Sequence, residues 1–307
     1  MEIFTTMITP YRKDGSVDME TALRYVDFYY ESGIDGIFAV CQSSEIFFLS
    51  LEERVALNRA VYACAKELER TGGRRFTVVS SGHVSDSLED QSHELCAIAA
   101  SGTDALILIT NRLDPHNEGD DVFIANAEKL LAELPKDVKL GFYECPYPYK
   151  RLVTPRILDW CLTTDRFYYM KDTCCDAALM KQRCQQLAGS HFKLLNANCQ
   201  TLLESMRNGG DGYCGIMCNF HPRLYAWLGY NYDREPQKAE LVQGLIGSLG
   251  FTEGGLPYPL TAKYHMGLCG IDTHLSARNR AAEELTDYGK SCMKQMKLVT
   301  DEMEKQL

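Results

Sequence analysis

Phe167-Tyr168-Tyr169-Met170-Lys171-Asp172 is the stretch that decides the fold, because its aromatic and apolar residues predict a buried strand that ends on a lysine. Lys171 is therefore expected where the strand leaves the core. Partial burial disfavours the ammonium form, and a neutral amine is a nucleophile that attacks carbonyl groups to form a Schiff base. From this stretch alone, the more ordinary interpretation is a lysine that reaches solvent or pairs with Asp172.

A second predicted strand, 138–143, brings a tyrosine to the same place. The interval from Tyr143 to Lys171 has the length of one β-α-β step. Consecutive strands of a parallel sheet end side by side, so these two side chains are expected to meet at one rim. A phenol beside an amine can relay protons, which makes Tyr143 the predicted proton shuttle.

Strand and helix patterns alternate along most of the chain. The predicted strands are 3–8, 36–41, 76–81, 105–110, 138–143, 167–172, 192–195 and 213–217. The predicted helices between them include 17–32, 51–68, 88–100, 122–134, 155–162 and 177–187. Ser50 and Glu53 have the capping-box spacing at the start of the second helix. Eight such strands predict a parallel sheet closed into a (β/α)₈ TIM barrel.

The rival fold is an open, doubly wound sheet. No G-x-G-x-x-G or Walker-type loop follows any strand, so that fold lacks its phosphate-binding signature. After residue 230 only helical patterns remain, at 236–248, 260–268 and 277–305. We therefore predict a barrel over 1–230 and a C-terminal helical extension over 231–307, packed on the barrel or on a partner subunit.

Composition narrows the class of protein. The chain has 307 residues, 45% apolar and 24% charged, which is typical of a globular protein with a large core. A net charge of −10 disfavours binding to nucleic acid and to anionic membranes, and no apolar run has the length of a membrane span.

The cysteines and histidines suggest a location but no metal site. Thirteen cysteines without C-x-x-C pairs fit a reducing, cytoplasmic environment, and most are predicted to be small core residues. His265 and Cys269 share a helix face, but no third and fourth ligand is evident, so packing is the favoured interpretation.

Five motifs in order resemble the dihydrodipicolinate synthase and N-acetylneuraminate lyase family of class I aldolases. Met170-Lys171-Asp172 is similar to the family's K-[ED] Schiff-base site, and Tyr143 with Pro146 is similar to its Y-N-x-P motif. The other matching segments are Met7 to Tyr11 with Asp14 to Asp18, Glu45 with Leu49 to Arg54, and Gly210 to Asn219. The resemblance covers essentially the whole chain.

The resemblance implies a homo-oligomeric barrel, a dimer or tetramer, in which Lys171 forms an imine with pyruvate or another 2-oxo acid. Tyr143 would shuttle the protons. The activity would be that of a class I lyase or aldolase acting on a carbon–carbon or carbon–oxygen bond, with no cofactor and no metal. The candidate substrate-binding residues are Gln42, Ser43, Ser44, Asn198, Cys214 and Arg112.

The loop Cys41-Gln42-Ser43-Ser44-Glu45 departs from the family's G-T-T-G-E or G-S-T-G-E pattern. Ser43 keeps a hydroxyl at the second threonine. Cys41 and Ser44 replace both glycines, and glycine lets backbone N–H groups approach an anion closely. The alternative interpretation of this loop is an ordinary polar connection after a strand.

Residues 110–115 replace the family's P-Y-Y-N-[RK]-P segment, so the tyrosine that reaches the neighbouring subunit's site in synthases and many lyases is missing. Arg112 or Asn111 stands there instead. An arginine cannot shuttle protons, but it could add positive charge for an acidic substrate. The alternative is that Arg112 is simply a surface residue of the loop.

Two further departures concern specificity. Tyr147-Pro148-Tyr149 stands where the synthases carry an arginine for the second substrate's carboxylate, so we expect that this chain is not a dihydrodipicolinate synthase. Asn198 lies where sialic-acid lyases carry an acidic pair. It could bind a hydroxyl, although an N-cap for a helix near Thr201 is favoured.

Two classes of function remain open on this sequence. The first is an active Schiff-base enzyme, and the second is a catalytically lapsed barrel that binds a 2-oxo acid or related ligand in a regulatory role. His83, at the end of the strand 76–81, is expected to face the same rim as Lys171, either as a polar residue behind the site or as a solvated loop histidine.

Overall fold

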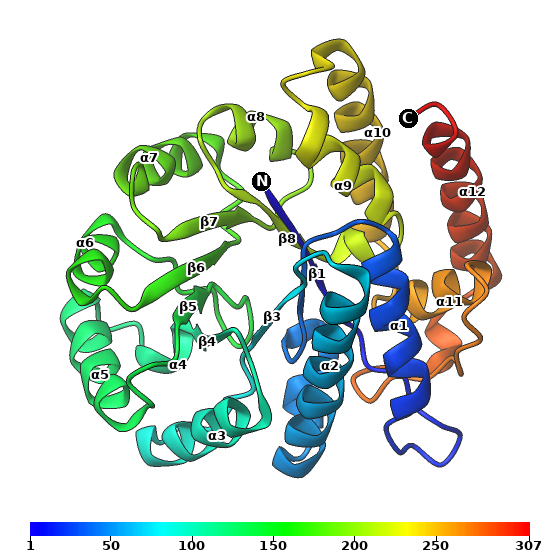
Figure 1. Cartoon of the computed structure of the whole chain (residues 1–307). Coiled ribbons are helices and arrows are strands. Elements are labelled where there is room, and N and C mark those ends of the chain that lie inside the picture. Colours follow the sequence, from blue (N-terminus) through cyan, green and yellow to red (C-terminus); the bar gives the residue numbers. More distant parts are fainter.

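The computed structural model describes all residues 1–307 and contains a closed barrel of eight parallel strands (Figure 1). Each strand pairs with its neighbour in sequence, and β8 pairs with β1 to close the sheet. The (β/α)₈ prediction is confirmed, and the open sheet is excluded. The strands are β1 (Glu2–Thr6), β2 (Gly36–Phe38), β3 (Thr77–Ser80), β4 (Ala105–Ile109), β5 (Leu140–Tyr143), β6 (Phe167–Asp172), β7 (Lys193–Asn196) and β8 (Gly212–Gly215).

Helices follow each strand and form a ring outside the barrel (Figure 1). The ring consists of α1 (Met19–Glu31), α2 (Leu51–Gly72), α3 (Leu88–Ser101), α5 (Asp120–Glu133), α6 (Pro155–Thr164), α7 (Ala177–Leu187), α8 (Leu202–Arg207) and α9 (Pro222–Asn231). Shorter turns are α4 (Thr110–Leu113) and the 3₁₀ segments η1 (Gln42–Ser44), η2 (Ile46–Phe48) and η3 (Ile216–Asn219). The predicted capping box of Ser50 and Glu53 opens α2.

Side chains inside the barrel come from alternate positions of each strand. The ring of Phe4 lies 5.7 Å from that of Tyr169 across the barrel, centroid to centroid. Gly36 on the adjacent strand makes room, because a Cβ atom there would lie 2.7 Å from the Phe4 ring and 2.5 Å from a backbone oxygen. Outward-facing residues such as Phe142 instead pack against the helices, as its contact with Phe123 of α5 shows.

The C-terminal extension contains α10 (Pro236–Gly254), α11 (Leu260–Leu268), η4 (Ala282–Glu284) and α12 (Asp287–Glu304). These helices lie on one side of the barrel, beside α1 and α9 (Figure 1). The prediction of a helix over 277–305 is wrong for its first third, because α12 begins only at Asp287. Its early residues form an irregular segment because the backbone N–H groups of Arg278 and Asn279 bind the Glu45 carboxylate instead of helical carbonyls.

All thirteen cysteines are free. Cys41, Cys214 and Cys218 are buried, as expected for small core residues, whereas Cys96 is only half-buried. None of the helices combines the length and the apolar character that crossing a membrane requires.

Candidate active site

Lys171 and Tyr143 lie side by side at the carboxyl end of the barrel. The two residues are direct partners in the pairing of β5 with β6. The Lys171 amine lies 4.2 Å from the centre of the Tyr143 ring. Both residues are nearly buried, with 7% and 4% of their surface exposed. The predicted meeting of the two side chains is therefore present in the structure.

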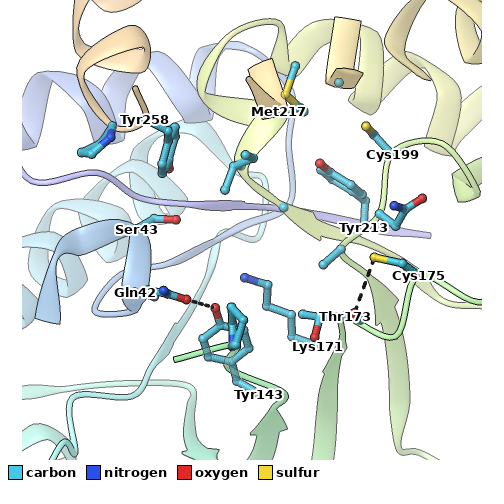
Figure 2. Close-up of a pocket in the computed structure, with 18 of the residues that line it drawn as sticks. Gln42, Ser43, Tyr143, Lys171, Thr173, Cys175, Cys199, Tyr213, Met217 and Tyr258 are labelled. Atoms are coloured by element: carbon cyan, nitrogen blue, oxygen red, sulfur yellow. Dashed lines mark hydrogen bonds between the residues drawn. The ribbon is translucent and has the colours of Figure 1, made fainter. Parts of the chain in front are cut away.

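Both side chains open into a cavity of about 480 Å³ (Figure 2). The cavity lies over the carboxyl ends of the strands, where loops of a barrel carry chemistry. Five of the predicted site residues line it: Lys171, Tyr143, Gln42, Ser43 and Asn198. The opposite wall comes from the C-terminal extension.

The amine of Lys171 makes neither a hydrogen bond nor an ion pair and points into the cavity (Figure 2). Its near neighbours are aromatic rings, those of Tyr143 and, at 5.7 Å, Phe38. The ordinary interpretation, in which this lysine reaches solvent or pairs with Asp172, is wrong. Successive residues of a strand face opposite sides, so Asp172 points out of the barrel.

The Tyr143 hydroxyl donates a hydrogen bond of 3.0 Å to Oε1 of Gln42 (Figure 2). Burial raises the pKa of Tyr143 well above its usual range, so the phenol is protonated at neutral pH. Gln42 therefore fixes the direction of the phenol proton, and the oxygen's remaining lone pair is free to accept one.

Behind the site, Arg183 of α7 binds the residues that follow the two catalytic candidates. Its guanidinium pairs with Glu144 at 2.7 Å and with Asp172. All three side chains are excluded from water. Backbone N–H groups of Val153 and Thr173 also bind Glu144, at 2.7 and 3.0 Å. The outward-facing carboxylates thus fix the ends of β5 and β6.

The loop after β2 tolerates the loss of both family glycines. Cys41 is in the extended region, with φ −144°, and Ser44 also has a negative φ. Neither position therefore needs glycine. The N–H groups of Gln42 and Ser43, at the start of η1, donate no hydrogen bond within the chain. They remain available to an anion in the cavity.

Two of the predicted binding residues do not reach the cavity. The Ser44 side chain is fully buried and donates to the carbonyls of Met7 and Ala39, both at 2.7 Å, so it holds the loop rather than a ligand. Cys214 on β8 is also buried, and its thiol does not line the cavity. The prediction of substrate contact is wrong for both side chains.

Arg112 does not line the cavity either. Its guanidinium pairs with Asp86 at 2.6 Å and lies over the ring of Phe47, 5.5 Å from the centroid. The structure therefore does not supply positive charge to the site from this position. The alternative, that Arg112 is simply a surface residue of the loop, does not describe it fully either, because only 10% of the side chain is exposed.

Asn198 lines the cavity but uses its amide oxygen locally. Oδ1 accepts from the N–H and the hydroxyl of Thr201, at 3.0 and 3.1 Å, just before α8 begins at Leu202. Asn198 thus stabilises the turn that precedes α8, whose N-cap residue is Thr201, and the prediction of Asn198 as the N-cap is wrong. The amide group of Asn198 still borders the cavity.

The two histidines considered earlier lie outside the cavity. His83 is fully buried, accepts from the N–H of Ile109 at 2.7 Å and contacts Gln91. Because Ile109 ends β4, His83 lies at the same end of the barrel as Lys171 without lining the cavity, and the solvated-loop interpretation is wrong. Burial lowers its pKa to about 4. His265 packs against Phe220, and its Nδ1 lies 3.6 Å from the sulfur of Cys269.

Sequence patterns did not identify the wall that the C-terminal extension supplies. Tyr258, Asn279 and Arg280 line the cavity although they follow the barrel in sequence. Lys150, in the loop after β5, also borders it. The basic side chains of the lining are then Lys150, Lys171 and Arg280, and no carboxylate is among the lining residues.

Comparisons with known proteins agree with this geometry. The model of the dihydrodipicolinate synthetase family matches residues 1–109. A 4-hydroxy-tetrahydrodipicolinate synthase of Saccharophagus degradans is 25% identical over 85% of this chain and 93% of its own length. One of Laribacter hongkongensis is 29% identical over 72% of each chain.

Solved structures share the fold over nearly the whole chain. One is YagE, a prophage protein of the dihydrodipicolinic acid synthase family from E. coli K12, solved in complex with pyruvate. It has a TM-score of 0.83 and 19% identity and covers 99% of this chain and 98% of its own. This structural match shows the shared fold.

Replacing Arg183 by methionine is expected to lower the free energy of unfolding by about 3–5 kcal/mol, because two buried carboxylates lose their cationic partner. Urea unfolding measures the change. The matched control is Arg207→Met, which removes an exposed pair with Glu240 and should change stability by at most about 1 kcal/mol. Equal effects of the two substitutions would contradict the role of Arg183.

Proposed function

We propose, from the relationship of this chain to the dihydrodipicolinate synthase family, that it is a Schiff-base-forming lyase or aldolase acting on pyruvate or another 2-oxo acid. The observation that carries the proposal is the unpaired Lys171 amine facing a cavity, beside the Tyr143 phenol. An amine without a carboxylate partner is free to reach a carbonyl carbon in the cavity, as Schiff-base chemistry requires.

In the proposed reaction the Lys171 nitrogen attacks the keto carbon of the 2-oxo acid. The adduct loses water to form an imine, whose protonated form withdraws electrons from the neighbouring carbon. A bond at that carbon then breaks in the cleavage direction or forms with an aldehyde in the reverse direction. Tyr143 gives a proton to the departing water and receives protons in later steps, while Gln42 orients its hydroxyl.

A carboxylate next to the keto group fits the same end of the cavity. The free N–H groups of Gln42 and Ser43 are donors of the kind that bind anions, and no acidic side chain lines the cavity to repel one. The Ser43 hydroxyl donates a hydrogen bond of 3.0 Å to the hydroxyl of Thr6, and Ser43 also lines the cavity. YagE, a protein of similar fold, was solved with pyruvate, which has this chemistry.

4-Hydroxy-tetrahydrodipicolinate synthesis is the second candidate function, because the curated relatives carry that name. Against it, Pro148 stands where the family's synthases have an arginine, and proline offers neither charge nor an N–H group. Arg151 cannot substitute, since it pairs with Asp114 and Asp120 outside the cavity. Lys150 is the cation that could, and its single charge lacks the bidentate geometry of arginine.

Assembly into a homo-oligomer and a cytoplasmic location belong to the proposal. Phe48 and Tyr147, near the carboxyl end of the barrel, are 50% and 55% exposed and offer apolar surface for a second copy. The free cysteines fit a reducing compartment.

Borohydride treatment in the presence of pyruvate is expected to fix a covalent adduct on Lys171, detected by mass spectrometry of the peptide. Lys171→Met should abolish the adduct. Lys150→Met is the matched control, because it removes the other lysine of the cavity and should leave the adduct on Lys171. Absence of an adduct with each of several 2-oxo acids would refute the proposed chemistry, and an adduct without any turnover would favour the catalytically lapsed alternative.

Tyr143→Phe is expected to slow turnover by about 10²–10⁴-fold and to slow imine formation less, because a general acid–base group acts in several proton transfers. Single-turnover trapping separates the two steps. The substitution keeps the ring packed against Phe38 and removes only the hydroxyl. A variant that turns over like the parent would show that Tyr143 is a packing residue.

The purified protein is expected not to condense pyruvate with aspartate semialdehyde efficiently. A hydrogen bond to a charged group contributes about 1.5–3 kcal/mol, so the missing arginine weakens transition-state binding by about 10- to 150-fold. A coupled assay measures the condensation. A kcat/KM of about 10⁴ M⁻¹s⁻¹ or more would instead establish the second candidate function.

A further inference from the structure

Arg280 reaches the cavity from a segment that sequence reasoning assigned to a helix. Residues 276–281, called here the C-terminal strap, lie between α11 and η4 and contact Glu45 of the loop after β2. Asn279 and Arg280 of the strap line the same cavity as Lys171. The strap therefore places a permanently charged group at the wall opposite the barrel strands.

The strap is fixed in position by a buried carboxylate. Oε1 of Glu45 accepts from the N–H groups of Arg278 and Asn279, at 2.6 and 3.1 Å. Its Oε2 lies 3.1 Å from the amine of Lys263, which also donates to the carbonyl of Ser276. Glu45 and Lys263 are both shielded from water, so this contact is not weakened by solvent.

Arg280 itself has an unused donor. Its Nη1 donates to Glu284 at 2.8 Å, and the structure gives Nε and Nη2 no hydrogen-bond partner. Nε is shielded from water, whereas Nη2 is not and remains open to a ligand. A hydrogen bond from a guanidinium group to a carboxylate is charge-assisted and stronger than a neutral one.

The cavity contains enough basic side chains to bind a second anionic group. A 2-oxo acid bound as an imine on Lys171 brings one carboxylate, for which Gln42 and Ser43 offer N–H groups. The lining contains no acidic side chain, and Lys150 has only the neutral carbonyl of Thr173 as a partner, at 2.7 Å. Positive charge beyond that needed for one carboxylate is therefore present.

We propose that Arg280 is a specificity-determining residue that binds a second carboxylate, at the distal end of the substrate, with Nη2 of its guanidinium group as the donor. The substrate class is then a 2-oxo acid with two carboxylates. This inference rests on the proposed Schiff-base function. It moves the role once considered for Arg112 to the opposite wall of the cavity.

Trapping with borohydride tests the proposal without knowledge of the aldehyde partner. The probes are 2-oxoglutarate, 2-oxoadipate and 2-oxopimelate, each compared with the uncharged-tail 2-oxo acid of equal length, 2-oxopentanoate, 2-oxohexanoate or 2-oxoheptanoate. The half-saturating concentration for the adduct on Lys171 is measured for each. The parent protein should prefer the diacid at one or more chain lengths.

In Arg280→Met that preference is expected to fall about 10- to 150-fold, the contribution of a charge-assisted hydrogen bond. Arg280→Lys should retain part of the preference, because the positive charge stays and the planar guanidinium group is lost. Arg207→Met, which removes a comparable exposed pair on α8, should keep the parent's ratio.

The outcomes separate this inference from the proposed function. Trapping of pyruvate without any preference for a diacid, or with a preference that survives Arg280→Met, overturns the role of Arg280 and leaves the Schiff-base function intact. An equal loss for both members of each pair indicates a structural role and also overturns it. No trapping of any 2-oxo acid overturns both.

Discussion

The ion-pair network of Arg183 with Glu144 and Asp172 is the constraint on which the site depends. Each carboxylate directly follows a candidate catalytic residue in the sequence. Because successive side chains point to opposite sides of the sheet, the carboxylate faces outward when the catalytic candidate faces the inside of the barrel. One guanidinium therefore fixes both strand ends. Burial raises the pKa of Glu144 while the guanidinium opposes that shift, and backbone N–H groups satisfy the remaining oxygens. The polar network is thus placed behind the site, where it can set geometry without occupying the cavity.

A second buried carboxylate, Glu45, organises the other side of the cavity. It directly follows the loop η1, has φ 61°, and binds the N–H groups of two strap residues. The left-handed backbone at a residue with a side chain is sparsely populated, and the contacts of that side chain offset its cost. The loop that borders Lys171 and the strap that carries Arg280 are consequently parts of one arrangement. A change in either is expected to be transmitted to the other through Glu45.

Local sequence patterns correctly predicted the features that depend on residues close together in the chain. The bounds of β6, α7 and α11 agree with prediction, and the β-α-β interval correctly brought Tyr143 to Lys171. Ser44 was misassigned because a motif position says nothing of where its hydroxyl points. The strap was misassigned for a different reason. The strap has a helical sequence pattern. Glu45, far away in the sequence, offers a buried carboxylate to the N–H groups of the strap, and this tertiary contact outweighs the helix propensity.

The charge of the cavity runs against the charge of the chain. A net charge of −10 repels anionic substrates at a distance, and yet the lining of the cavity contains basic side chains and no acidic one. Field lines from a recessed site with low-dielectric walls are focused through its mouth, so a few local cations can outweigh a diffuse opposite charge there. The separation of sign also has a consequence for binding. Because the lining contains no carboxylate, the Lys171 amine has no ion-pair partner and stays free to face a ligand in the cavity.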